Sequence, residues 1–179
     1  MTTLTAPALS RRSLLKIGLL GGAVLATAGV TVALVDRFAS APAQGHLALR
    51  PADLPILAAL VPVMLEGAVE PTRLSDAARN TIQGLDHQLA HLSPEMLKLT
   101  RQMLDVLALP VTRGPLTGIW SGWESASPEA VRHFLARWEN SALALLRMGH
   151  ASLLQLVMMA WYAQPESWAH CGYPGPPTV

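Results

Sequence analysis

The chain has 179 residues and a formal net charge of +1; 51 % of its residues are hydrophobic and only 14 % are charged. About a quarter of the residues are charged in an average soluble domain, so this chain is expected to present apolar surface that a partner or a membrane covers. Beyond residue 43 acidic residues slightly outnumber basic ones and no basic cluster occurs, which argues against nucleic acid as a partner.

The first 43 residues have the three-part order of an export signal: a basic segment, an apolar segment and an exit of small residues. The apolar segment is the uncharged run Ile17–Val35. Before it stands an arginine pair followed by an apolar pair and a lysine, which resembles the twin-arginine leader pattern. The residues that carry this pattern are Arg11, Arg12, Leu14, Leu15 and Lys16. We therefore expect export in the folded state by the twin-arginine translocase, with the periplasm as destination.

Small residues mark the exit of this leader. Ala41 and Ala43 fit a peptidase that accepts A-x-A, so we predict cleavage after Ala43 and assign residues 1–43 to a signal peptide. Cleavage after Ala41 is less favoured, because Pro42 would then follow the cut. The alternative is a retained leader. Its apolar run is long enough to cross a bilayer, for which about 20 apolar residues suffice, and it would then anchor the protein in the inner membrane.

Apolar residues beyond the leader recur at helical spacing, and no run shows the sustained two-residue alternation of a strand. The pattern predicts a linker over residues 44–50 and an all-α bundle of about five helices over residues 51–165. The first helix is expected over about 54–69, with Asp53 as its cap and Pro62 as a bend or interruption.

Three more helices follow in chain order. One is expected over 74–92. The next two begin at Ser-Pro pairs, which place a serine at the cap and a proline at the first helical position. The first pair predicts a helix over 94–108 and the second a helix over 128–139. The side chains that the 94–108 helix is expected to bury are Met96, Leu97, Leu99, Met103, Leu104 and Leu107.

The last predicted helix, residues 142–163, has few strongly polar side chains, among them Arg147 and His150. A helix that is apolar nearly all round is expected to be buried, either centrally in the bundle or beneath a partner. The two basic residues make it a poor transmembrane candidate. Pro165 is expected to end it, and residues 166–179 are predicted to form an extended, proline-rich C-terminal arm.

Tryptophan and tyrosine gather in two places. Trp120 and Trp123 lie in residues 111–126, which are expected to form a loop or a short broken helix. The second group, at the C-terminal end, is Trp161, Tyr162, Trp168 and Tyr173. Both residue types are enriched at interface centres, and extended proline segments lose little entropy on docking. The C-terminal group is therefore either a partner-binding surface, or Trp161 and Tyr162 complete the core while the tail frays.

No set of residues assembles an active site, so we expect no catalytic residues and no metal or cofactor bound by this chain. His87 and His91 have the spacing of two zinc ligands, but Gln88 stands where HExxH requires glutamate. Cys171 lies near the chain end, which is unsuited to a catalytic thiol. As the single cysteine it cannot form an internal disulfide, and without a CxxCH motif covalently attached haem is excluded.

The leader, the small helical body and the C-terminal ending together resemble a known family. The ending reads Trp161-Tyr162, then Trp168-Ala169, then Gly172-Tyr173-Pro174-Gly175-Pro176-Pro177. It resembles the small subunits of periplasmic FAD-dependent dehydrogenases of the glucose-methanol-choline type, which oxidise gluconate, glucose or sorbitol. The resemblance implies a non-catalytic small subunit, and a large partner subunit that holds FAD and is carried through the export channel.

The resemblance also implies a partner-binding surface and a possible bond between the subunits. Its expected residues are Trp120, Trp123, Trp161, Tyr162, Trp168, Cys171, Tyr173, Pro174, Gly175, Pro176 and Pro177, with Cys171 a candidate for an intersubunit disulfide. Two other functions stay open. One is a stand-alone periplasmic binding protein with a pocket for an apolar ligand, and the other is a metalloenzyme that uses His87 and His91.

Overall fold

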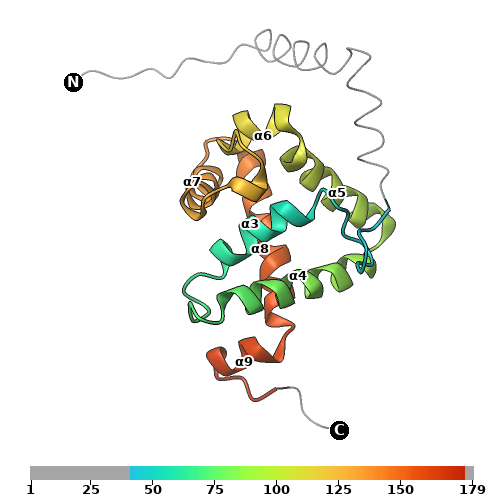
Figure 1. Ribbon diagram of the computed structural model, residues 1–179, viewed down its shortest axis with the longest axis vertical. Coiled ribbons are helices and arrows are strands. Elements are labelled where there is room, and N and C mark those ends of the chain that lie inside the picture. The colour runs from blue at the N-terminus through green and yellow to red at the C-terminus, as the bar shows by residue number, and fades with distance from the viewer. Residues whose placement is uncertain (1–40, 176–179) are drawn as a thin grey trace, which may run out of the picture. The chain divides into compact units, whose positions relative to one another are not determined.

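The computed structural model describes residues 41–175, except the side chains of residues 169–171. The twin-arginine pattern and the last four residues lie outside the described residues. Within residues 41–175 the chain is all-α and forms no β-strand, which confirms the predicted fold class (Figure 1). The elements are α3 (Leu54–Met64), α4 (Leu74–Ala90), α5 (Pro94–Ala108), α6 (Pro110–Thr117), a 3₁₀ helix η1 (Trp123–Ser125), α7 (Pro128–Glu139), α8 (Ala144–Tyr162) and α9 (Pro165–Cys171).

The two Ser-Pro pairs begin α5 and α7, as predicted. The Oγ of Ser93 accepts a hydrogen bond from the amide of Met96 at 3.3 Å, and the Oγ of Ser127 accepts one from the amide of Ala130 at 3.2 Å. The proline after each serine costs no helical hydrogen bond, because the first amides of a helix have no intrahelical acceptor. Both helices span the residues that the sequence predicts.

The helix at the centre of the body is α3 (Figure 1). Ile56, Leu60 and Val63 pack in one core cluster with residues of α5, η1, α7 and α8. Leu57 and Val61 pack in a second cluster with residues of α4 and α8. Because apolar neighbours cover α3 on both sides, every one of its residues is apolar. The central position considered for the 142–163 helix is therefore occupied by α3.

α3 begins at Leu54, as predicted, but its end differs from the prediction. The helix ends at Met64 rather than near residue 69, with Pro62 in its last turn. Gly67 follows this end with a left-handed φ of +81°, which departs from helical geometry. Asp53 occupies the predicted N-cap position, but its side chain does not cap the helix: its carboxylate accepts hydrogen bonds from the backbone amide and the guanidinium of Arg50 instead of first-turn amides.

Residues 44–50 were expected to form a linker, and this prediction is wrong. Ala48 and Leu49 are buried in the core cluster of α4 and α8. The carboxylate of Asp86, on α4, accepts hydrogen bonds from the amides of Leu47, Ala48 and Leu49 at 2.7, 2.9 and 2.8 Å. The segment is thus part of the folded body.

The region between α5 and α7 is the broken helix that the sequence allowed. α6 contains Pro115 and ends at Thr117. Gly118 follows, and its φ of +79° is a left-handed conformation that glycine adopts at low cost. η1 follows, and its Trp123 enters the core.

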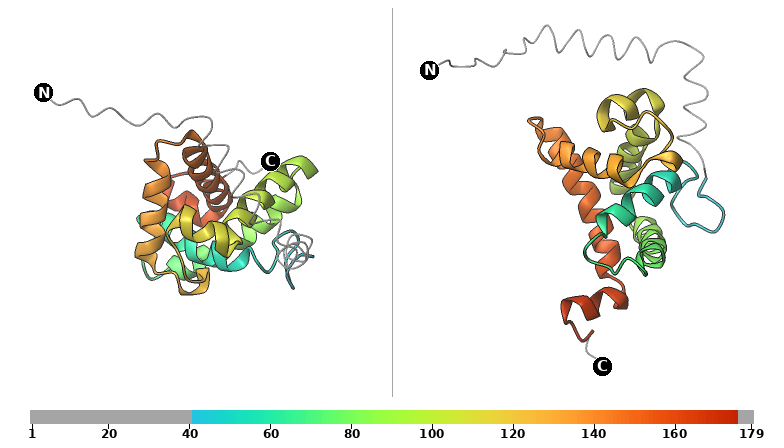
Figure 2. Two further views of the ribbon diagram at one scale, coloured as in Figure 1. Left: turned by 90° about the horizontal axis from the view of Figure 1, so that it is seen from above. Right: turned by 60° about the vertical axis from the view of Figure 1, so that its left-hand side comes forward.

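The C-terminal region is more helical than predicted. α8 runs along one side of the body and leads into α9 (Figure 2, right). α9 begins at Pro165, because proline is tolerated in the first turn of a helix. The predicted extended arm is therefore wrong up to Cys171, whereas Gly172–Gly175 is not helical. No helix in residues 41–175 has the length and hydrophobicity needed to cross a bilayer.

Candidate protein-binding face

One side of α8 is exposed and largely apolar. Successive residues along it are three or four positions apart, so they form one stripe down the helix. We call this stripe the outer face of α8; its residues are Leu145, Met148, Ser152, Gln155, Met159 and Tyr162. Leu145 is 76 % exposed and Met148 is 64 % exposed, which are high values for apolar side chains of this size. The face is therefore an exposed and mostly apolar stripe, whereas a solvated helix side usually carries charged and polar residues.

The opposite side of α8 fixes this orientation. Leu153, Val157 and Trp161 are buried against the helices of the two core clusters, with Leu153 in one and the others in the second. α8 contains no acidic residue, and its one arginine, Arg147, donates a hydrogen bond to the carbonyl of Ser141 at 2.6 Å. The outer face therefore lacks the charges that ordinarily keep an exposed helix side soluble.

Two aromatic residues past the end of α8, Trp168 and Tyr173, lie close in the chain to the last residue of the outer face, Tyr162. The C-terminal aromatic cluster consists of Tyr162, Trp168 and Tyr173. The ring centroids of Trp168 and Tyr173 lie 5.7 Å apart in an edge-to-face arrangement. The indole of Trp168 donates a hydrogen bond to the carbonyl of Tyr162 at 3.1 Å, and the amide of Tyr173 donates to the carbonyl of Trp168 at 2.9 Å. The chain after α9 thus folds back on Trp168.

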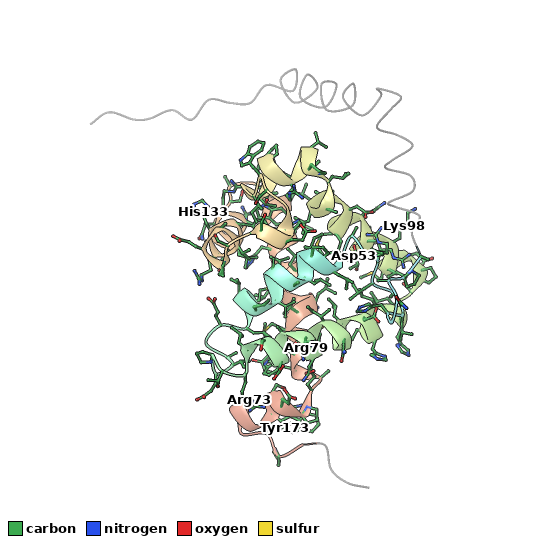
Figure 3. The ribbon with its side chains drawn as sticks, viewed as in Figure 1. Asp53, Arg73, Arg79, Lys98, His133 and Tyr173 are labelled. Carbon is green, nitrogen blue, oxygen red and sulfur yellow. The ribbon has the colours of Figure 1, made fainter. Side chains whose placement is uncertain are left out.

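α9 is attached to the body by polar contacts. The carboxylate of Glu166 accepts a hydrogen bond from the side chain of Asn80 at 3.1 Å and lies 4.0 Å from the guanidinium of Arg73. Ser167 is buried, and its hydroxyl donates to the carbonyl of Gln164 at 2.8 Å. Figure 3 shows Arg73 and Tyr173 at this end of the body. The contacts precede Trp168, so they do not depend on the aromatic cluster.

A cavity of about 210 Å³ lies beside α9. Glu70, Arg73 and Glu166 line it together with Trp161 and small apolar residues. Pockets for small organic ligands have volumes of roughly 300 to 1,000 Å³ and mostly apolar walls. This cavity is smaller and carries three charges, which does not favour an apolar ligand.

The tryptophans predicted for the interface fall into two groups. Trp123 and Trp161 are each only 3 % exposed and belong to the core, so their assignment to an interface is wrong. The indole of Trp123 donates a hydrogen bond to the carbonyl of Leu107 at 2.8 Å. Trp120, in contrast, is 75 % exposed, and its ring lies over Gly114.

The rest of the predicted surface lies at the chain end. Pro174 is exposed, and Gly175, with a φ of +103°, lies against the ring of Trp168. The side chain of Cys171, and all of Pro176 and Pro177, lie outside the described residues.

A second group of exposed apolar side chains was not expected. Met96 and Leu99 were predicted to be buried by α5, but both are exposed. The other large apolar residues exposed on α5, on α6 and before α3 are Val106, Val111 and Leu47. Apolar residues occupy more of the circumference of α5 than its neighbours cover. The prediction of burial therefore failed for Met96 and Leu99.

A buried cluster of charges lies where the N-terminal segment meets α5. The guanidinium of Arg50 is fully buried and donates to the carboxylates of Asp53, at 2.9 and 3.0 Å, and Asp105, at 2.6 Å. Burial acts to lower the pKa of Arg50, but these bonds outweigh it and raise that pKa above its usual value. Burial also raises the pKa of Asp105, against the effect of Arg50. The cluster joins the segment before α3 (Asp53 is labelled in Figure 3) to α5.

The two histidines considered as zinc ligands lie at the exposed end of α4. A ring nitrogen of His91 is 2.7 Å from the carbonyl oxygen of His87, a contact within one helix turn. In the part of the chain that the structure describes, no three His, Cys, Asp or Glu side chains are grouped so that they could hold a metal ion.

The outer face was only partly predictable. Tyr162, at its C-terminal end, was found from residue type, as was Trp168 of the adjacent C-terminal aromatic cluster. Leu145, Met148 and Met159 were missed, although the scarcity of charge along the 142–163 segment is the signal that marks them. The chain matches no protein-family model, no curated protein and no solved structure.

Proposed function

We propose that this protein is a non-catalytic small subunit that binds a larger FAD-containing oxidoreductase and escorts it through the twin-arginine route into the periplasm. The partner would oxidise a sugar, a polyol or an alcohol and would hold the FAD, while this chain binds no cofactor. The leader residues Arg11 and Arg12 and the resemblance of the C-terminal ending support this proposal.

The observation that carries the proposal is the outer face of α8 with the C-terminal aromatic cluster. Apolar area removed from water stabilises a complex by about 25 cal/mol per Å², so an exposed stripe of leucine, methionine and tyrosine favours a bound state. Tyrosine and tryptophan at its end are the residue types that most often dominate binding energy. A surface of this kind fits a folded protein with a complementary apolar patch.

The folded export route gives such a subunit a purpose. FAD is inserted in the cytoplasm, and only a folded, loaded enzyme presents the surface that the escort binds. Binding that favours the folded partner also stabilises it, by about 2.7 kcal/mol when the free escort is at a hundred times its dissociation constant. Export would then be coupled to completed assembly.

The test is affinity purification of the tagged native protein from the detergent-solubilised cell envelope, which holds both a cleaved and an anchored form, followed by mass spectrometry and a flavin absorbance spectrum. We expect a large flavoprotein to co-purify. The variants Leu145→Glu and Met148→Glu, both on the outer face of α8, should abolish its co-purification. Leu99→Glu is the matched control, because Leu99 is also an exposed apolar residue of a helix but lies on α5.

The possible results separate the alternatives. A colourless monomer from the wild-type chain would contradict the subunit function and favour a stand-alone binding protein. Loss of the flavoprotein with Leu99→Glu but not with Leu145→Glu would contradict the outer face of α8 as the binding surface. Bound zinc in the purified wild-type protein would favour the metalloenzyme alternative.

A further inference from the structure

The bond at which leader cleavage is predicted, Ala43–Gln44, belongs to the folded body. Ala43 is only 9 % exposed. Its amide donates a hydrogen bond to the carbonyl of Leu49 at 2.8 Å, and its carbonyl accepts one from the amide of His46 at 2.9 Å. Gly45, with a φ of +82°, makes the turn between them. Both backbone groups of Ala43 are therefore already paired within the protein.

Asp86 fastens the second half of this segment to α4. Its buried carboxylate accepts the amides of Leu47, Ala48 and Leu49. Burial acts to raise the pKa of Asp86, but the three amides outweigh it and hold that pKa below its usual value. The carboxylate is thus ionised at neutral pH and remains a strong acceptor for all three amides.

Two further contacts join this segment to α5. The guanidinium of Arg101 donates to the carbonyl of Ala48 at 3.1 Å, and the buried Arg50 binds Asp105. Leu49 is fully buried in the core cluster of α4 and α8. Freeing Ala43 from Leu49 therefore means disturbing a segment that side chains of two helices hold in place.

A peptidase needs this same segment in a different conformation. Proteins that bind extended peptides pair with the backbone groups of the peptide and place alternate side chains in pockets. For cleavage after Ala43, the side chain of Ala43 would have to enter a small pocket of the enzyme. In the folded chain that side chain is turned into the protein's own interior, and its amide and carbonyl are occupied.

We propose that the fold itself protects the Ala43–Gln44 bond, so that the exported protein keeps its leader and is anchored in the inner membrane by Ile17–Val35. The inference uses one part of the proposed function, the twin-arginine route, because only a protein exported in the folded state meets the peptidase with this segment already packed. Binding of a flavoprotein is not required for it.

The test compares the same bond in two contexts. The full chain in detergent micelles and a synthetic peptide of residues 33–50 are each incubated with purified leader peptidase, and the products are identified by intact mass. We expect cleavage of the peptide after Ala43 and cleavage of the folded chain at least about tenfold more slowly, because cleavage is then limited by the small population of the open segment.

Two variants show whether the hydrogen bonds of Asp86 to residues 47–49 are responsible for the slow cleavage. Asp86→Asn weakens the anchor of residues 47–49 and should bring the cleavage rate of the full chain towards that of the peptide. Phe134→Leu is the matched control. It loosens the other core cluster, which Phe134 occupies, and should leave the rate low. In cells, the wild-type chain should be found at full-length mass in the membrane fraction and the Asp86→Asn chain partly as a soluble product that begins at Gln44.

Three outcomes would overturn the inference. They are rapid cleavage of the folded wild-type chain after Ala43, a peptide that the enzyme does not cut, and equal acceleration by Asp86→Asn and Phe134→Leu. None of them bears on whether a flavoprotein co-purifies, so failure of this inference and failure of the subunit function are distinguished by separate measurements.

Discussion

The indole of Trp168 donates a hydrogen bond to the carbonyl of Tyr162, the last residue of α8, at 3.1 Å. Trp168 and Tyr173 therefore contact the helical body and add an aromatic pair at the end of an exposed apolar helix face. The pair is completed by Tyr173, which is itself exposed. Because these contacts are made at the surface, they can affect binding without affecting the fold.

Removal of the C-terminal aromatic cluster should separate stability from binding. Deletion of residues 168–179 removes the second half of α9 but leaves Glu166 bonded to Asn80 and Ser167 buried, so the first residues of α9 keep their polar contacts with the body. We expect the helical circular dichroism of α3–α8 to be retained and at least a tenfold loss of affinity for the flavoprotein, which corresponds to about 1.4 kcal/mol. Trp168→Ala should also lower the affinity for the flavoprotein, but by less than the deletion does. Loss of the helical signal would contradict this assignment and make the cluster part of the fold.

The three amide bonds of Asp86 predict a specific dependence of stability on pH. Asp86→Asn should lower the free energy of unfolding at pH 7 by about 2 to 3 kcal/mol, since hydrogen bonds to a charged acceptor are lost. The folded-state pKa of Asp86 is lower than its unfolded value, near 3.9. Its contribution is therefore fully present above that value and is lost as the pH falls through the folded-state pKa. Urea unfolding should show the two proteins converging below about pH 4. A constant difference would contradict the role of the charge.

The buried charge cluster predicts the opposite trend. Arg50→Met leaves the carboxylates of Asp53 and Asp105 close together without their cation, which should cost about 3 to 5 kcal/mol at pH 7. The pKa of Asp105 is already raised by burial, and loss of Arg50 raises it further. A carboxyl group whose folded-state pKa is raised destabilises the protein above that pKa, and the cost disappears as the pH falls through it. The variant should regain stability relative to the wild-type chain as the pH is lowered from 7, measured by urea unfolding.

A surface ion pair serves as the control for the charge cluster. Arg132 and Glu66 form an exposed pair with two hydrogen bonds, at 2.8 and 3.2 Å. Exposed pairs contribute little because water and salt screen them. Arg132→Gln should therefore leave the unfolding curve unchanged. A cost as large as that of Arg50→Met would contradict the assignment of the Arg50 effect to burial.

Structural features that depend on neighbouring residues in the chain were predictable from the sequence. Features that depend on residues far away in the chain were not. The bounds of α5 and α7 follow from a serine and a proline beside the helix they begin. The packing of residues 44–50 depends on Asp86, which is 37 to 39 residues away in the chain, so no local pattern reveals it. The same holds for Trp120 and Trp123, which are three positions apart. One is exposed and the other is buried because η1 turns only the second towards Leu107.

α3 and α8 show that the burial of a whole helix is equally hard to predict from its sequence. Both are apolar nearly all round, and this property predicts burial without saying what covers the helix. In α3 the cover comes from both core clusters of this chain. In α8 the cover comes from one side only, and the outer face is left exposed. Only the relative positions of the neighbouring helices distinguish the two cases.

Two glycines that each lie against a tryptophan ring should respond differently to substitution by alanine. A Cβ at Gly149 would be 2.6 Å from the ring of Trp138, and a Cβ at Gly114 would be 2.5 Å from the ring of Trp120. Trp138 is buried, and its indole donates to the carbonyl of Leu116 at 2.8 Å. Trp120 is largely exposed, so its ring can move into solvent.

We therefore expect Gly149→Ala to destabilise the protein by about 1 to 2 kcal/mol, because overpacking a core costs more than the roughly 1 kcal/mol that alanine gains over glycine within a helix. Gly114→Ala should be neutral or stabilising by up to about 1 kcal/mol, because the ring of Trp120 gives way and the propensity gain remains. Urea unfolding measures both values. If Gly114→Ala lowers the free energy of unfolding as much as Gly149→Ala, the ring of Trp120 is held in place by its surroundings. If Gly149→Ala is as stable as the wild-type chain, the ring of Trp138 is free to move.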